Sequence, residues 1–409
     1  MNRYTSDRTG RYQGPKVERV ELSEKHLGLR LVLAIAFLLV GMATIAFTFS
    51  RLVGKSSGWQ EVSVSSDSGV NNSNEFTLLY NLGSAGVAAG TESRAISAVY
   101  TRCCEETYQI FNSDMSFEGV GNLYEINTHP NETVEISPLL YEALSALEEA
   151  GYRYQYLGPL YRVMENLCGC ETDPEARQFD YDDSPEYAAE FAAVSAFASD
   201  PDQIQLELLG DNTVCLHISD DYLSYASDNG ISCFLDLSWM KNAFITDYIA
   251  DSLIAGGYTF GVLSSYDGFS RYLDDGAAGY SFNVYNRSGQ TVTELGTASI
   301  RNMRALVTLR DYPLSEQDRY STYVYSDGTI RNLKLSPTDG RCHAALSSLT
   351  AAGQTQGCAE LLLALLPVYI SEEAPDDDTI SMLCDSGIYT LYCVGGEMVS
   401  NIPDLTFAE

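Results

Sequence analysis

The amino-acid sequence predicts an α+β domain, of mixed α/β character, behind a single N-terminal transmembrane helix. Of the 409 residues, 45% are hydrophobic and 11% are aromatic, which is enough to build a packed core. A run of 20 uncharged residues separates Arg30 from Arg51. Beyond this run, helical and strand-like apolar spacings follow one another without a strict β-α alternation, which favours the α+β class.

Residues 31–50 have the length and composition of a membrane-spanning helix. About 20 apolar residues cross a hydrocarbon core of about 30 Å. The alternative is a cleaved signal peptide, whose apolar segment usually has only about 7–15 residues and is followed by small residues. Here Phe47, Phe49 and Arg51 occupy the exit of the segment. We therefore expect a retained signal anchor.

The charges that flank this segment predict its orientation. Seven Lys and Arg residues precede it, whereas only Arg51 and Lys55 follow closely, and positively charged flanks stay in the cytoplasm. Residues 1–30 are thus expected to form a cytoplasmic basic tail, with the remainder outside the cytoplasm at the cell membrane. Residues 51–75, rich in Ser, Asn and Gly, are interpreted as a tether, and 76–400 as the exported domain.

The expected exported part is strongly acidic. Residues 1–51 contain eight basic and four acidic residues, so 16 of the 24 Lys and Arg and 52 of the 56 Asp and Glu follow position 51, a net charge of −36. Such a surface repels phosphate backbones, which excludes nucleic acid as a partner. Solubility of an exported domain is the simplest reason for the acidity.

The ten cysteines all lie in the expected exported part, where disulfides are allowed. The spacings of the closest cysteines, C-C at 103–104 and C-G-C at 168–170, are not those of a structural zinc site, and the chain has four His. We expect buried or disulfide-linked structural cysteines. They are Cys103, Cys104, Cys168, Cys170, Cys215, Cys233, Cys342, Cys358, Cys384 and Cys393.

Apolar spacing and turn residues locate the secondary structure. Ser137 is placed to cap a helix, Gly256-Gly257 to end one, and Pro367 to stop another. The predicted helices are 93–112, 137–150, 240–255 and 356–366. The predicted strands are 76–80, 204–208, 213–218, 233–237, 259–263, 280–285 and 387–394, and 174–183 is predicted to be an acidic loop.

Several segments, in order, resemble the motifs of ApbE-type proteins, which are FAD:protein FMN transferases. G-N-L-Y-E-I-N at 121–127, V-E-I-S-P-L-L at 134–140 and G-P-L at 158–160 resemble the family's S-x-L-x-x-L-N, V-x-V-S-P-E-L and G-x-F-D-P-T-V-G-P-L. L-D-L-S-W-M-K-N-A-F-I-T-D at 235–247 lies ungapped on L-D-L-G-G-I-A-K-G-Y-A-V-D. S-P-T-D-G-R at 336–341 resembles D-P-x-T-G-R/K.

The resemblance implies a two-lobed ApbE-like domain that binds FAD in a cleft, with Mg²⁺ on the pyrophosphate. In the family, FMN is transferred to a Thr hydroxyl of a target protein and AMP leaves, so the implied partner is a flavin-acceptor membrane or surface redox protein. The lipid bilayer is a second partner, through the N-terminal helix. The implied cofactor-binding residues are Asn127, Ser238, Asn242, Asp247 and Asp267, and the implied metal ligand is Glu360.

The sequence departs from the family pattern at several of these positions. Ser238-Trp239 replaces a Gly-Gly pair, which puts an indole where backbone would approach the cofactor. The family Lys falls on Asn242, and Lys241 is rotated from that position by about 100° on a helix. The metal-ligand Thr falls on Ala364, and F-D-P-T falls on R-Y-Q-Y at 153–156.

Three functions therefore remain open. The chain is an active exported flavin transferase, a degenerate member of the fold that binds a flavin or a partner without chemistry, or an unrelated surface-exposed binding domain. Structural roles are equally open for single residues: Asp247 as a helix cap, Glu360 as a solvated carboxylate, and Asn127 as the support of a turn. The acidic run at 376–378 is interpreted as a solvated loop.

Overall fold

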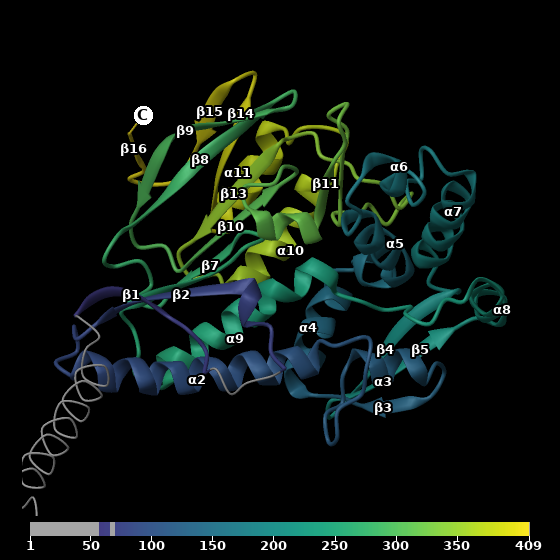
Figure 1. The fold of residues 1–409 in the computed structure, drawn as a ribbon, viewed down its shortest axis with the longest axis horizontal. Coiled ribbons are helices and arrows are strands. Elements are labelled where there is room, and N and C mark those ends of the chain that lie inside the picture. Colours follow the sequence, from purple (N-terminus) through teal and green to yellow (C-terminus); the bar gives the residue numbers. More distant parts are fainter. Residues whose placement is uncertain (1–56, 66–69, 409) are drawn as a thin grey trace, which may run out of the picture. The chain divides into compact units, whose positions relative to one another are not determined.

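The computed structural model describes residues 57–65 and 70–408, and its largest element is an eight-stranded sheet whose paired strands are all antiparallel (Figure 1). The strands β1 and β2 form one edge of the sheet, and β6 and β7, which follow them in the sheet, come from a distant part of the chain. Its spatial order is β1 (Gly58–Val62), β2 (Phe76–Leu82), β6 (Gly261–Ser265), β7 (Phe269–Tyr272), β10 (Ala305–Arg310), β13 (Ser348–Gly353), β14 (Ile388–Val394) and β15 (Glu397–Ser400).

Both faces of this sheet are covered, as strand β10 shows. Its alternate residues Ala305, Val307 and Leu309 belong to one apolar core, and Leu306 belongs to a second one. The first face packs on α9 (Lys241–Ala255) and α10 (Cys358–Tyr369), with α2 (Ala89–Ile110) beside α9. The second core lies against a three-stranded sheet of β16 (Thr406–Ala408), β9 (Thr291–Ile300) and β8 (Tyr280–Ser288). The short helix α11 (Asp377–Asp385) packs on β14.

A second region, mainly helical, is inserted between β2 and β6 (Figure 1). Its apolar side chains, such as Leu147, join the same first core as Leu365 of α10, so the two regions share one interior. The mixed α+β class predicted from the sequence is thereby confirmed. The region contains α3 (Leu123–Thr128), β3 (Thr133–Glu135), α4 (Pro138–Glu149), α5 (Gly158–Cys168), α6 (Asp173–Ala176), α7 (Pro185–Ser199), β4 (Ile204–Gly210), β5 (Thr213–Ile218) and α8 (Asp220–Asn229), and its three strands pair in the order β3-β5-β4. A small ribbon of β11 (Thr322–Val324) and β12 (Ile330–Asn332) lies against α5.

Pro367 does not stop a helix as predicted, because α10 continues through it to Tyr369. A proline lacks the N–H that would bond the carbonyl four residues earlier, here that of Leu363. The Tyr152 hydroxyl donates to this Leu363 carbonyl at 2.6 Å. The helix therefore tolerates the proline because a side chain from the second region satisfies the freed acceptor.

Other differences concern boundaries. The predicted strand 233–237 is not a strand, and the predicted loop 174–183 begins inside α6. Strand β1 lies within the predicted tether 51–75, and β16 lies beyond residue 400, so the folded part is longer than 76–400.

The predicted anchor 31–50 lies outside the described residues. Within 57–65 and 70–408, no helix is both long and apolar enough to cross a membrane.

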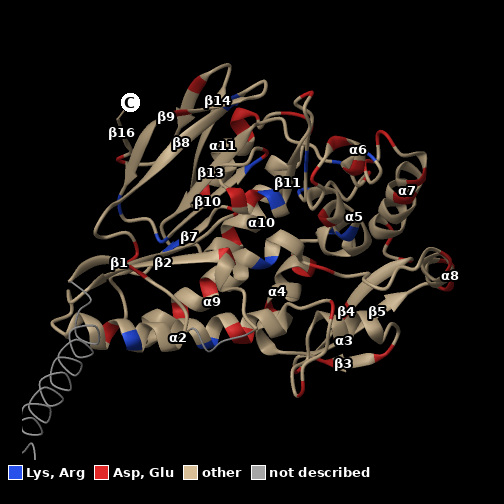
Figure 2. Ribbon diagram, in the orientation of Figure 1, with Lys and Arg blue, Asp and Glu red and all other residues tan. Residues whose placement is uncertain are grey.

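Acidic side chains are distributed over most elements of the domain, and basic ones are fewer (Figure 2). All ten cysteines fall in the described part of the chain, and none of them is in a disulfide there. Seven of the ten are buried, so they act as small apolar core residues. This agrees with the structural role expected for them, without the disulfides that export would allow.

Candidate functional site

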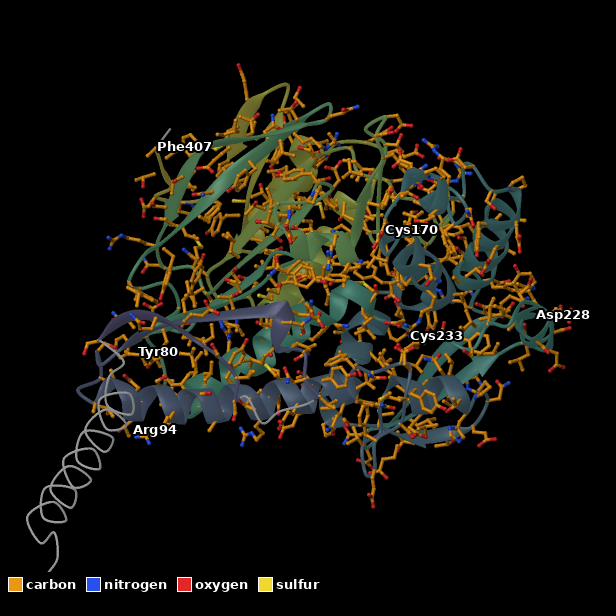
Figure 3. The ribbon with its side chains drawn as sticks, in the orientation of Figure 1. Tyr80, Arg94, Cys170, Asp228, Cys233 and Phe407 are labelled. Atoms are coloured by element: carbon orange, nitrogen blue, oxygen red, sulfur yellow. The ribbon has the colours of Figure 1, made fainter. Side chains whose placement is uncertain are left out.

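The candidate site is built around the segment 233–240, which connects α8 to α9. The chain runs inward from Asp228 of α8, at the periphery, to Cys233 at the start of this segment (Figure 3). Asn127 of α3, 3% exposed, replaces the missing strand ladder. Its Oδ1 accepts the N–H groups of Phe234 and Leu235 at 2.8 Å each, and its Nδ2 donates to the Leu235 carbonyl at 2.8 Å. Asn127 thus positions this segment through its backbone.

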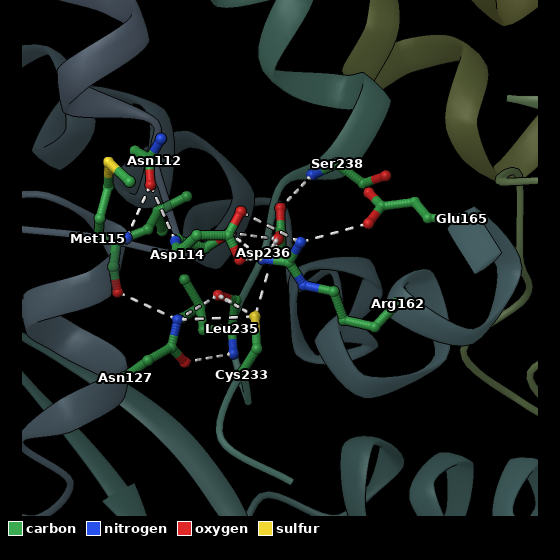
Figure 4. Close-up of polar contacts among 12 residues, drawn as sticks. Asn112, Asp114, Met115, Asn127, Arg162, Glu165, Cys233, Leu235, Asp236 and Ser238 are labelled. Atoms are coloured by element: carbon green, nitrogen blue, oxygen red, sulfur yellow. Dashed lines mark hydrogen bonds and ion pairs between the residues drawn. The ribbon is translucent and has the colours of Figure 1, made fainter. Parts of the chain in front are cut away.

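Asp236 is the centre of a polar network in this segment (Figure 4). Its carboxylate accepts the Ser113 hydroxyl at 2.7 Å and the Ser238 N–H at 2.6 Å. The Arg162 guanidinium of α5 lies 3.6 Å from Asp236, 2.6 Å from Asp114 and 3.3 Å from Glu165. One arginine is therefore shared by three carboxylates, which leaves an excess of negative charge around it. Burial raises the pKa of Glu165.

Ser238 and Trp239 stand where the resemblance has two glycines. Ser238 has φ +47°, a left-handed conformation that glycine adopts without strain, and its buried hydroxyl has no hydrogen-bond partner. The Trp239 indole is turned into the interior: its N–H donates to the Leu333 carbonyl at 2.9 Å and its ring stacks on Phe269. Lys334 Nζ lies 5.1 Å from the indole centre.

Asp236, Ser238 and Trp239 line a cavity of about 680 Å³, which we call the main cavity. Trp239, Phe111 and three tyrosines, Tyr108, Tyr266 and Tyr320, contribute its aromatic surface. Its charged lining is Glu75, Asp114, Arg162, Glu165, Asp236 and Lys241. A second cavity of about 1040 Å³ shares Ser113, Asp114 and Arg162 with the first. The main cavity suits a planar aromatic ligand, because aromatic walls stack on such rings.

Two of the sequence-predicted site residues, Asn242 and Asp267, meet just behind this cavity. Asn242 Nδ2 donates to Asp267 Oδ2 and to Glu75 Oε2, at 3.0 Å each, while its own Oδ1 has no partner. Burial raises the pKa of Asp267 to about 6, and the charge of Glu75 adds to the rise. Both residues are fully buried, and neither contributes to the cavity wall, whereas Ser238 does.

Asp247 lies away from the cavity, at the first turn of α10. Its two carboxylate oxygens accept the N–H groups of Cys358 and Ala359 at 2.9 Å each, and the Arg271 guanidinium lies 2.7 Å away. Negative charge at a helix N-terminus is stabilised by the helix dipole. This geometry supports a helix-capping role for Asp247.

Glu360 occupies the first turn of the same helix. Its carboxylate accepts the Gly357 N–H at 3.0 Å, and the side chain is otherwise exposed. Mg²⁺ prefers several oxygen ligands at octahedral positions. Asp247 is saturated by two amides and a guanidinium, and the Ala364 side chain offers no oxygen. Among the residues that the structure describes, no group of three or more His, Cys, Asp or Glu side chains is placed to hold a metal ion. These residues do not fit Mg²⁺.

Sequence reasoning missed several residues of the main cavity: Arg162, Glu165, Ser113 and Tyr266. They come from separate segments, and no local motif marks them. One signal existed in Asp236, the acid of L-D-L at 235–237 that matches the family pattern, because a buried carboxylate requires a cation partner. That requirement predicts an arginine or lysine nearby but does not say which.

Comparison with known proteins places the fold. No family model and no curated protein matches the sequence. Among solved structures, the ApbE protein of Thermotoga maritima matches with a TM-score of 0.54 and 14% identity, over 84% of this chain and 96% of that one. The flavin transferase ApbE of Vibrio cholerae aligns at 16% identity over 80% of this chain and 93% of that one, with a TM-score of 0.47. The chain therefore has an ApbE-like fold, as the motifs implied.

Proposed function

We propose that the described domain binds a flavin through its ring system in the main cavity, and that it does so without transferring FMN to a protein threonine. The observation that carries the proposal is the aromatic-walled cavity, which is lined in part by the segment 236–241 within the region that resembles the ApbE motif. FAD is the flavin that the resemblance implies. The structural match shows an ApbE-like fold and so argues against coincidental motif matches, the premise of the third alternative, an unrelated surface-exposed binding domain.

The aromatic lining supports a ring ligand. Tyr108 and Tyr266 are half-buried at the cavity, and Tyr320 is 58% exposed. Stacking of aromatic pairs contributes about 0.5–1.5 kcal/mol beyond the burial of area, and exposed rings gain most when a ligand covers them.

The positions that the resemblance assigns to the metal support the non-catalytic form. Transfer of a phosphoryl group requires its developing charge to be neutralised, usually by Mg²⁺. Here Glu360 accepts the Gly357 amide, and the side chain of Ala364 carries no oxygen that could ligate a metal. We derive no metal-assisted step from these residues.

The location of the protein is part of the proposal. Residues 31–50 would anchor the chain in the cell membrane, with the N-terminus in the cytoplasm and the described domain outside. A flavin-binding domain in this position would act beside membrane or surface redox proteins, which are the partners that the resemblance implies. Fusing a reporter active only outside the cytoplasm to the C-terminus tests this orientation; a silent fusion that is nevertheless present in the membrane fraction contradicts it.

Flavin binding is tested with the full-length chain purified in detergent. Flavin fluorescence is titrated with protein, for riboflavin, FMN and FAD in turn. We expect saturable binding that weakens about tenfold in the Tyr266→Leu variant, because the ring loses a stacking surface. Trp59→Leu is the control, since Trp59 is an exposed aromatic outside the cavity. Absence of binding by all three flavins would refute the proposal.

The same preparation tests for transfer. Protein, FAD, Mg²⁺ and a domain carrying an acceptor threonine are incubated together, and covalent flavin is sought by in-gel fluorescence after denaturation. We expect none, with an active ApbE transferase as the positive control. A fluorescent acceptor band would contradict the non-catalytic form and leave flavin binding intact.

A further inference from the structure

The charge of the main cavity bears on which flavin it accepts, an inference that rests on the proposed function. Four carboxylates line the cavity, those of Glu75, Asp114, Glu165 and Asp236. The lining cations are Arg162 and Lys241. With all six groups ionised, the lining has a charge of −2. A phosphate-bearing ligand is therefore repelled, whereas an uncharged ring is not.

Neither cation is free to meet a phosphate. The Arg162 guanidinium lies within 3.6 Å of three carboxylates, those of Asp114, Glu165 and Asp236, and it also donates to the Ser113 hydroxyl at 2.7 Å. A phosphate would have to displace these partners and leave the buried Asp236 carboxylate without its counter-charge, which is costly. Figure 4 shows the guanidinium directed into this network.

Lys241 is held in a similar way. Its Nζ lies 4.0 Å from Glu75 Oε1, and the charge of Glu75 raises the pKa of the lysine. Glu75 in turn accepts Asn242 Nδ2 through its other oxygen. Lys241 thus neutralises a carboxylate of the cavity wall.

We propose that the main cavity selects the uncharged flavin, riboflavin or a close non-phosphorylated analogue, over the nucleotides FMN and FAD. The ring meets the tyrosines, and the absence of phosphate on the ligand matches the excess of carboxylates. The site therefore differs in ligand charge from a site built for a pyrophosphate.

Competition among three flavins with one ring system tests this selection. With full-length protein at pH 7.5 and low salt, we expect riboflavin to bind at least tenfold more tightly than FMN or FAD, equivalent to about 1.4 kcal/mol. Higher salt should reduce this ratio, because salt screens repulsion between charges. Equal or tighter binding of FMN or FAD would overturn the selection while leaving flavin binding established. Failure of all three flavins to bind would overturn both proposals.

A charge-neutralising variant probes the cause. In Asp114→Asn/Glu165→Gln, two of the carboxylates around Arg162 lose their charge, so the guanidinium becomes available to a phosphate. The ratio of riboflavin to FMN affinity should fall at least tenfold. The matched control is Glu142→Gln/Glu149→Gln, which removes the same charge from two exposed positions of α4 outside the cavity and should leave the ratio unchanged. An unchanged ratio in the cavity variant would overturn the electrostatic explanation. The salt dependence of the unsubstituted protein tests it independently if that variant does not fold.

Discussion

Replacing Asn127 by alanine tests how the segment at the centre of the site is held. The Asn127 side chain makes three hydrogen bonds to the backbone of residues 234–235, all at 2.8 Å, and a fourth to the Leu123 carbonyl at 3.0 Å. In Asn127→Ala, the N–H groups of Phe234 and Leu235 and the Leu235 carbonyl lose these partners. The Leu123 carbonyl retains its position within α3 and contributes little to the loss.

The magnitude follows from these three backbone groups. A buried polar group left without a partner costs about 1–3 kcal/mol. Taking about 1 kcal/mol for each gives a loss of about 3 kcal/mol in the free energy of unfolding, a large fraction of the stability of an ordinary domain. Flavin affinity should also fall, because Ser238 and Trp239 follow directly after the released segment.

Urea unfolding of the purified protein, followed by circular dichroism, measures this loss. Asn127→Asp should be intermediate, because it keeps acceptors for the two N–H groups and loses the donor. The external control is Asn229→Ala, which removes a single exposed bond to the Tyr225 carbonyl and should cost less than about 0.5 kcal/mol. If Asn127→Ala lost less than about 1 kcal/mol, the segment would not depend on this side chain.

Three further predictions concern buried charges. Burial raises the pKa of Asp267 to about 6 from 3.8, so the folded state favours the protonated form. Relative to Asp267→Asn, the free energy of unfolding, measured with urea, should fall by about 3 kcal/mol as pH rises from 4 to 7. A difference between the two proteins that does not depend on pH would refute this. Burial lowers the pKa of Lys334 to about 8 from 10.5; relative to Lys334→Met, stability should rise between pH 8 and 10.5, and a flat difference would contradict it. Arg271→Met leaves Asp247 without its cation and should lower the free energy of unfolding by about 3–5 kcal/mol. The double variant Asp247→Asn/Arg271→Met should lose less than the sum of the two single variants, and strict additivity would exclude coupling of the pair.

The sequence predicted the helices α2, α4, α9 and α10 and the strands β2, β4, β5, β6, β8 and β14, because their apolar spacing is local. The other elements were not predicted, and the acidic run 376–378, interpreted as a loop, begins α11. The prediction failed at 233–237, where the apolar pattern is that of a strand but the hydrogen-bond partner is a side chain more than 100 residues away, Asn127. It failed at Pro367 for the same reason, because the partner of the freed carbonyl, Tyr152, belongs to another region. Local patterns do not specify such distant partners.

The candidate site was predictable only where a motif crosses it. The segment 235–247 led to Ser238 and Asn242, and both lie in or directly behind the cavity. Arg162 was not predicted, because its role depends on how α5 is placed against 233–240. Glu360 was assigned to a metal by resemblance, and the structure places its carboxylate on the Gly357 amide. A carboxylate at the third residue of a helix often takes such a capping role.

The motifs that persist in this chain are explained by packing. A Cβ on Gly121 would lie 2.2 Å from the Glu135 carbonyl oxygen, and one on Gly158 would lie 2.7 Å from that of Cys233. Gly340, at φ +74°, packs against Leu160, so the matching segments 158–160 and 336–341 meet in the fold.

Packing also explains Asp247, the last carboxylate of the matching segment 235–247. A Cβ on Gly357 would lie 2.5 Å from Asp247 Oδ2, and both oxygens of Asp247 accept amides of α10. Glycines and a capping carboxylate of this kind are required by the backbone whether or not phosphoryl transfer occurs. Positions that serve only a metal, such as Ala364, are under no such constraint. The ApbE-like fold therefore does not depend on residues that would hold a metal, and the aromatic cavity beside Ser238 is the part of the site to which we assign flavin binding.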